Sequence, residues 1–136
     1  QGKPRFTADP AQHRRLLERF MDASQRGDSE AIQGLLHANA CMVSDGGGVV
    51  TAAIRPLLGA ERIGRLYWAI ERRGAVQPAR LGTVNGELAI LRFEGDRLHS
   101  ITTIVVEGDR ICRLYNVLNP HKLGAAVTGS AAGTSS

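Results

Sequence analysis

The sequence predicts an α+β domain in which helices cover one face of an antiparallel sheet. The first half of the chain combines helical periodicity with capping residues, and the second half contains four consecutive strand-like segments joined by short glycine turns. Helices followed by a run of strands are typical of the α+β class. With 136 residues, the chain is long enough for one hydrophobic core, and a second domain would not fit.

The first helix is predicted to begin after Asp9, an N-cap residue that is followed by Pro10 at the first helical position. Residues 1–8 lack periodicity and are interpreted as a linker. Gly27 is a natural C-terminal stop, and Asp28 can cap a second short helix that forms a hairpin with the first. The apolar stripes comprise Leu16, Leu17, Phe20 and Met21 in the first helix, and Ile32, Leu35 and Leu36 in the second.

The stretch 40–48 reads as an apolar strand that delivers Asp45 to a glycine turn, and 49–55 reads as a return strand ended by Pro56. A third helix is predicted over about 60–73, with a core-facing stripe and with Trp68 just off it. The stripe consists of Ile63, Leu66, Tyr67 and Ile70.

Four strands are predicted in the second half, over 79–84, 87–93, 98–106 and 111–118. Asn85-Gly86 is a strong hairpin signal, and the tetrapeptide Glu-Gly-Asp-Arg occurs twice, between the later strands. The prediction is therefore a four-stranded antiparallel meander with three tight turns. The small residues of 124–136 cannot bury enough surface to repay ordering, which predicts a disordered tail.

Composition narrows the function classes. Hydrophobic residues make up 43% and charged residues 22%, as in a soluble globular protein, and no apolar run is long enough for a membrane span or a secretory signal. We expect a cytoplasmic location and no membrane contact. The formal charge is +4, but the arginines are dispersed along the chain. This dispersion favours solvated helix faces over a nucleic-acid-binding surface. The alternative is a basic surface that binds an acidic protein partner.

We predict neither a metal nor another cofactor. The four histidines are scattered, and no Cys or His cluster has zinc spacing. Cys41 and Cys112 fall in predicted buried strands, where a thiol usually behaves as a small hydrophobic residue, so a disulfide is not expected.

Asp45 is the first candidate site residue. By strand alternation it shares a face with Cys41 and Val43, which leaves two interpretations: a cap of the glycine turn, favoured by residue type, or a polar handle at the lip of an apolar pocket. The residues proposed to line such a pocket are Asp45, Trp68, Tyr115 and Asn119. Whether the face shared by Tyr115 and Asn119 lines a pocket or packs elsewhere stays open.

The element order, together with Gly27-Asp28-Ser29-Glu30-Ala31-Ile32 and Ser44-Asp45-Gly46, resembles the nuclear transport factor 2-like superfamily and its SnoaL-like cyclases and ketosteroid isomerases. The resemblance implies a cone-shaped fold with an apolar pocket, and it implies Asp45 as general base if the protein is an enzyme. Phe20 and Thr102 stand where the isomerases keep their oxyanion-binding donors, so steroid isomerase activity is not expected.

Two motifs are more specific. Asp45-Gly46-Gly47-Gly48 and Asn119-Pro120-His121-Lys122-Leu123 resemble the paired signatures, Asp-Gly-Gly-Gly and Asn-Pro-Asp-Lys-Leu, of the SnoaL-like carboxy-terminal extension in a group of bacterial extracytoplasmic-function (ECF) sigma factors. His121 departs from the family Asp. Residues 4–6 also resemble the joint to the sigma domains. The resemblance implies a SnoaL-like domain over 9–123, after a linker over 1–8. Glycines let another chain approach closely, and Asn119-Pro120 redirects the chain. We therefore hypothesise that the surface contacting the sigma domains is formed or flanked by Gly46, Gly47, Gly48, Asn119, Pro120, Lys122 and Leu123.

The leading hypothesis is therefore a regulatory domain of an ECF sigma factor that acts with the sigma domains and RNA polymerase, with a small hydrophobic ligand as a candidate occupant of the pocket. This fragment is not expected to contact nucleic acid itself. The alternatives are a small-molecule isomerase, cyclase or dehydratase that uses Asp45, and a dimerisation domain that forms a homodimer.

Overall fold

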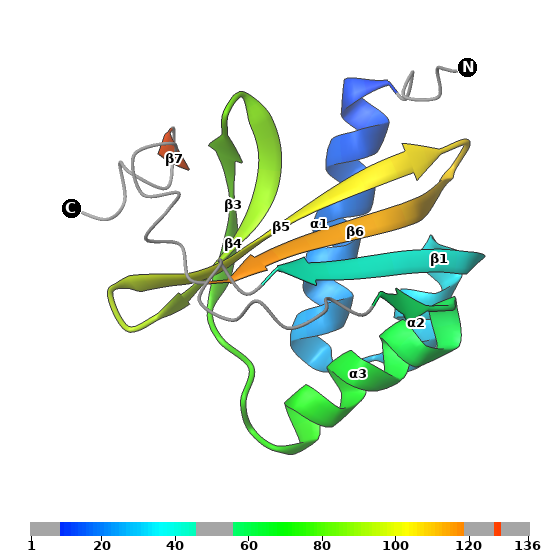
Figure 1. The fold of residues 1–136 in the computed structure, drawn as a ribbon, viewed down its shortest axis with the longest axis horizontal. Helices are drawn as coiled ribbons and strands as arrows, with labels where there is room; N and C mark the ends of the chain where they lie inside the picture. The colour runs from blue at the N-terminus through cyan, green and yellow to red at the C-terminus, as the bar shows by residue number, and fades with distance from the viewer. Residues whose placement is uncertain (1–8, 46–55, 119–126, 129–136) are drawn as a thin grey trace.

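The structure is a computed structural model that describes residues 9–45, 56–118 and 127–128. Three helices precede most of the strands, as Figure 1 shows. The helices are α1 (Pro10–Arg26), α2 (Ser29–Leu35) and α3 (Ala60–Arg72). The strands are β1 (Leu36–Asp45), β2 (Leu57–Leu58), β3 (Ala79–Val84), β4 (Glu87–Glu94), β5 (Arg97–Glu107), β6 (Arg110–Leu118) and β7 (Val127–Thr128).

The predicted caps set the helix ends. The Asp9 carboxylate accepts a hydrogen bond from the backbone N–H of Ala11 at 3.2 Å, and Gly27 ends α1 in the left-handed conformation with φ 65°. The Asp28 carboxylate accepts a hydrogen bond from the N–H of Ala31 at 3.1 Å and so begins α2. These contacts confirm the helical hairpin and its turn at residues 27–28.

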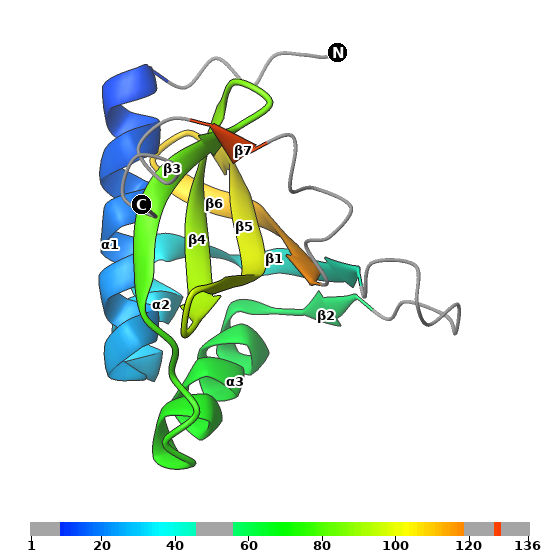
Figure 2. The same cartoon turned by 90° about the vertical axis from the view of Figure 1, so that its left-hand side faces the viewer.

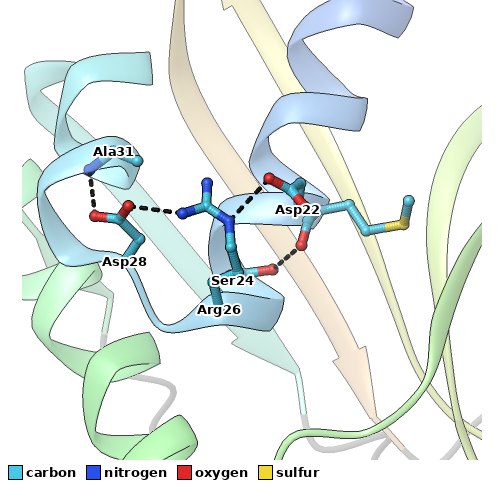
Figure 3. Close-up of polar contacts among 6 residues, drawn as sticks. Asp22, Ser24, Arg26, Asp28 and Ala31 are labelled. Atoms are coloured by element: carbon cyan, nitrogen blue, oxygen red, sulfur yellow. Dashed lines mark hydrogen bonds and ion pairs between the residues drawn. The ribbon is translucent and has the colours of Figure 1, made fainter.

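Arg26 ties the two helices together at this turn. Its guanidinium donates from Nε to Asp22 at 3.0 Å and from one terminal nitrogen to Asp28 at 2.8 Å, so that one cation bridges α1 and the cap of α2 (Figure 3). Hydrogen bonds from the Ala31 N–H and then from Arg26 hold the pKa of the Asp28 carboxyl below its ordinary value.

The antiparallel meander is confirmed. β3, β4, β5 and β6 pair in sequence order, and the β3–β4 turn has Asn85 and Gly86 at φ 53° and 81°, as a type I′ hairpin requires. Gly95 and Gly108, in the two Glu-Gly-Asp-Arg segments, also have positive φ. Both repeats therefore act as turns between adjacent strands.

The complete sheet has the order β2-β1-β6-β5-β4-β3-β7. β1 joins the meander through a parallel pairing with β6, and the arrowheads of the two strands point the same way in Figure 1. A parallel neighbour so far away in the sequence needs a long crossover connection, which here passes through α3 and the meander.

The main core lies between the helices and one face of the sheet, and Figure 2 shows α1 alongside the strands with α3 at one end of them. Phe20 of α1 and Tyr67 of α3 meet edge to face, with ring centroids 5.4 Å apart. Ala40 and Met42 of β1 and Leu114 of β6 are buried in the same core. A smaller cluster, formed by Val84, Ala89, Leu91 and Ile101, is separate from it.

Three expectations need correction. Leu36 does not continue the second helix but begins β1, where it is buried. Asp45 shares a face with Cys41 and Val43 as predicted, but the core face of β1 contains Ala40 and Met42, so this row points away from the core and Asp45 is exposed. In the predicted tail, Val127 and Thr128 form β7 and pair with β3, so these two residues differ from the expected disorder.

Several predictions lie outside the described residues: the linker 1–8, the glycine turn and return strand over 46–55, the second motif over 119–123 and most of the tail. The described helices include none that is long and apolar enough to cross a membrane. Within the same residues, no group of three His, Cys, Asp or Glu side chains could hold a metal ion. Cys41 and Cys112 are half-buried thiols not joined in a disulfide.

Candidate functional site

A cavity of about 330 Å³ lies between the helices and the sheet. Its apolar wall comes mainly from α3, its polar residues come from α1 and from β4, β5 and β6, and the segment after α3 forms its rim. Gln25 fixes that rim by donating a hydrogen bond from Nε2 to the carbonyl oxygen of Gln77 at 3.1 Å. The lining residues are Ser24, Gln25, Leu66, Tyr67, Ile70, Ala75, Val76, Gln77, Arg92, His99, Ser100, Asn116 and Leu118.

Arg92 is the dominant charged group of this cavity. It is only 9% exposed and lies on β4 on the same face as Ile90, a core residue. Its two terminal nitrogens donate to the hydroxyl oxygens of Thr102, at 2.9 Å, and Ser24, at 3.0 Å. Its guanidinium carbon lies 5.7 Å from the ring centroid of Tyr67. The cation is therefore held in place by neutral groups.

The neutral partners of Arg92 are themselves positioned by hydrogen bonds. The Thr102 hydroxyl donates to the side-chain oxygen of Asn116 on β6, and the Ser24 hydroxyl donates to the carbonyl oxygen of Met21 within α1. Both hydroxyls thus direct their remaining lone pairs toward the guanidinium. The network links α1, β4, β5 and β6 around the polar end of the cavity.

A β-bulge brings His99 to the same cavity. Arg92 pairs with Ser100 and Phe93 pairs with Leu98, so His99 is an extra residue in β5 with no register partner on β4. Bulges break the alternation of side chains between the two faces. His99 and Ser100 consequently both line the cavity, although they are neighbours in the sequence.

The predicted pocket residues do not gather in this cavity. Trp68 is 45% exposed, and Arg72 stacks over its ring at 5.1 Å. Tyr115 is 37% exposed and accepts a hydrogen bond from Arg113 at 3.2 Å, which raises the pKa of Arg113. Asp45 does not line the cavity either, and Asn119 lies outside the described residues.

On β6 the cavity side contains Asn116 and Leu118, so the face that includes Tyr115 and Val117 is the opposite one. This result answers the question that the sequence left open about the last strand. Phe20 is fully buried against Tyr67, and Thr102 is fully buried as an acceptor for Arg92, so neither position supplies the oxyanion donors of an isomerase.

The last described residues before the two motif segments lie at one end of β1 and β6. Asp45, the last residue of β1, is the register partner of Val117, and β6 ends at Leu118. The two strands are parallel, so Asp45, which begins the first motif, and Leu118, which precedes the second motif, lie at the same end of the strand pair. Gly46, Gly47, Gly48, Pro120, Lys122 and Leu123 lie outside the described residues.

Sequence reasoning missed Arg92 and His99. A signal for Arg92 exists in the alternation of β4, because Leu88, Ile90 and Arg92 share one face and a charged residue there points toward a core. His99 has no comparable signal, since its orientation depends on a bulge in the pairing of two strands.

Comparisons with known proteins agree with this architecture. The chain is 30% identical over 124 residues to the ECF RNA polymerase sigma factor SigJ of Mycobacterium tuberculosis, a match that covers 84% of this chain and spans only 39% of that protein's length. The crystal structure of SigJ matches with a TM-score of 0.65 at 29% identity, over 87% of this chain and 46% of the other. No protein-family model matches the chain.

A SnoaL-like protein from Burkholderia thailandensis matches with a TM-score of 0.61 at 16% identity, over 80% of this chain and 96% of the other, which shows the fold alone. The fold is therefore that of the SnoaL-like, nuclear transport factor 2-like domains. Within this class, the chain belongs to the SnoaL-like domains of ECF sigma factors. SigJ is the relative that shows this.

Proposed function

We propose that this chain is a regulatory domain of an ECF sigma factor, and that it modulates transcription initiation in the cytoplasm through contacts with the sigma domains and RNA polymerase. The observation that carries the proposal is the 30% identity to SigJ over 124 residues, together with 29% identity to its crystal structure. The two sequence motifs support the same assignment.

The contact surface is proposed to lie at the common end of β1 and β6. Asp45 and Tyr115 lie on the sheet face opposite the main core, and both are exposed. Asp45 offers a carboxylate and Tyr115 an amphipathic ring, a residue type enriched in protein interfaces. Gly46, Gly47, Gly48, Asn119, Pro120, Lys122 and Leu123 would extend this surface, with Lys122 supplying charge and Leu123 an apolar anchor.

The alternative role of Asp45 as a general base is not favoured by its position. A base must come within hydrogen-bond reach of the proton that it removes, directly or through one water. Asp45 is exposed and does not line the cavity, while the cavity itself contains a cation and neutral donors. A regulatory role on the surface fits this placement better than proton abstraction inside the fold.

Transcription in vitro tests the proposal. RNA polymerase would be reconstituted with the complete polypeptide that contains this chain, and with the same polypeptide lacking residues 9–136. We expect the deletion to change transcript yield at a promoter that the factor recognises. Arg65→Ala, which removes one partner of an exposed Arg65–Glu61 ion pair on α3, serves as a surface control and should leave the yield unchanged. Equal yields with and without the domain, or an upstream coding region without sigma domains, would contradict the proposal.

A further inference from the structure

Among the residues that the structure describes, Arg92 is a buried cation without an anionic partner. All thirteen Asp and Glu side chains of the chain fall in the described segments, and the ion pairs among them involve Arg14, Arg26, His37 and Arg65 but not Arg92. Its hydrogen bonds to Thr102 and Ser24 satisfy donors without neutralising the charge. Burial of an unpaired charge is strongly unfavourable, so such a group is retained where it has a use.

The guanidinium also has donor capacity left. It has five N–H groups, and its contacts with Thr102 and Ser24 use one hydrogen on each terminal nitrogen. Nδ1 of His99, which lines the same cavity, is buried and has no hydrogen-bond partner among the described residues. A cation with spare donor capacity and a ring nitrogen without a partner therefore line one cavity from adjacent strands.

The rest of the cavity is apolar. Leu66, Ile70, Val76 and Leu118 contribute to its wall, together with the ring of Tyr67. Its volume of about 330 Å³ lies at the lower end of the range for small-molecule sites. Apolar walls with a few convergent polar groups are the usual composition of such sites.

We propose that this cavity binds a small organic monocarboxylate, with the carboxylate on Arg92 and the apolar body against α3. A planar guanidinium pairs with a carboxylate through two parallel hydrogen bonds, a geometry that Lys or a neutral donor cannot reproduce. His99 lines the same cavity, and its buried Nδ1 is a second polar atom there without a partner among the described residues. Thr102 and Ser24 hold the guanidinium plane in advance, which reduces the entropy lost on binding.

This inference rests on the proposed function, and it names the class of ligand that would control the regulatory action of the domain. It is tested without polymerase, on the 136-residue chain itself, so its failure can be distinguished from failure of the transcription assay. Octanoate and benzoate serve as probes, octanamide and benzamide as their uncharged counterparts, and inorganic phosphate as an anion without an apolar body. Titrations are followed by the chemical shifts of the backbone amides.

We expect at least one of the two acids to bind saturably and to shift amides of β4, β5 and α3. Its amide should bind at least about tenfold more weakly, because hydrogen bonds to a charged group are stronger than neutral ones. Phosphate should produce no saturable shift at this cavity. Equal affinity of an acid and its amide, saturable phosphate binding at the cavity, or absence of binding by both acids would overturn the proposal.

Variants connect binding to Arg92. Arg92→Gln and Arg92→Met should each weaken binding of the acid at least about tenfold, while Arg113→Gln, which removes the same charge from the opposite face of the sheet, should not.

Neutral replacement of an unpaired buried cation should leave the free protein at least as stable as the parent. Acid binding of parental strength in a folded Arg92→Gln or Arg92→Met protein would contradict the role of Arg92. Lower stability of both variants without ligand would mean that Arg92 is structural.

Discussion

Asp45 and Val117 are register partners at the ends of two parallel strands, although 71 positions separate them in the sequence. Neighbouring strands lie about 4.8 Å apart, so the chain leaves β1 and β6 at adjacent points. The Asp-Gly-Gly-Gly motif begins at Asp45, and the Asn-Pro-His-Lys-Leu motif begins one residue after Leu118. The two motifs are far apart in the sequence, but both begin at the same end of two neighbouring strands. A single contact surface requires such an arrangement.

Asp45→Asn should change transcript yield in the complete polypeptide while leaving any small-molecule turnover at the background level of the parent. The physical reason is that Asp45 is exposed on the face opposite the core, next to the proposed contact surface, and does not line the cavity. Promoter output with RNA polymerase and turnover of candidate ketosteroid substrates are the two measurements. Isomerisation or dehydration by the parent that disappears in Asp45→Asn would restore the enzymatic interpretation.

Replacement of both Lys122 and Leu123 by alanine should alter transcript yield with little effect on stability. The segment belongs to the second motif, and a docking surface exposes side chains that contribute little to the core. Exposed substitutions usually cost less than about 0.5 kcal/mol, so the Tm of the isolated chain should stay within about two degrees. Thermal unfolding and the transcription assay are both measured on the parent and on this double variant. Unchanged yield combined with a large loss of Tm would assign the segment to the structural core of the domain.

Local signals predicted the elements well. Asp9, Gly27 and Asp28 set helix ends through contacts with residues nearby in the sequence, and Asn85-Gly86 sets its hairpin by its own backbone conformation. Such signals act over a few residues and are visible in a single sequence. Alternation likewise predicted which residues of β6 share a face.

The cavity depended on information that local patterns lack. Which face of β6 lines it follows from the packing of α1 and α3, so Tyr115 could not be distinguished from Asn116 by sequence. His99 enters the cavity through a bulge between β4 and β5, and the pairing of β1 with β6 joins distant segments. Trp68 is a pocket candidate by residue type, but its position on α3 leaves it 45% exposed.

The Asp28 cap should make part of the domain's stability dependent on pH. Because hydrogen bonds from Ala31 and Arg26 lower the pKa of Asp28 below the ordinary 3.8, the ionised carboxylate stabilises the folded state. This contribution is present above about pH 4 and is lost as the pH falls through the lowered pKa of the folded state. Asp28→Ser keeps a capping oxygen without the charge, so its Tm should fall less steeply below pH 4 than that of the parent.

Asp28→Ala removes the cap as well as the charge and should lower the Tm at neutral pH more than Asp28→Ser does. Thermal unfolding from neutral to acidic pH in all three proteins separates the two contributions. High salt should reduce the part due to Arg26, because that ion pair is exposed to solvent. If the Tm of the parent and the Tm of Asp28→Ser fell equally steeply below pH 4, Asp28 would not contribute to the pH dependence.

Gly64 and Gly34 provide a matched pair for testing how closely α2 and α3 pack. A Cβ at position 64 would lie 2.8 Å from Oγ and 2.9 Å from the carbonyl oxygen of Ser29, so α3 would have to move away from α2, whereas a Cβ at position 34 would have no neighbour within 4 Å. Overpacking costs about 1–3 kcal/mol, while replacing a helical glycine by alanine gains about 1 kcal/mol. Gly64→Ala should therefore lower the free energy of unfolding, and Gly34→Ala should raise it.

The displacement of α3 has a further consequence for the cavity, because Leu66, Tyr67 and Ile70 of this helix form part of its wall. Gly64→Ala should weaken binding of octanoate or benzoate in addition to lowering the Tm, while Gly34→Ala should bind as the parent does. Chemical denaturation and the amide-shift titration are to be measured on both variants under the same conditions. Equal stabilisation by the two substitutions would mean that α2 and α3 have room to accept a methyl group, and that α3 need not move.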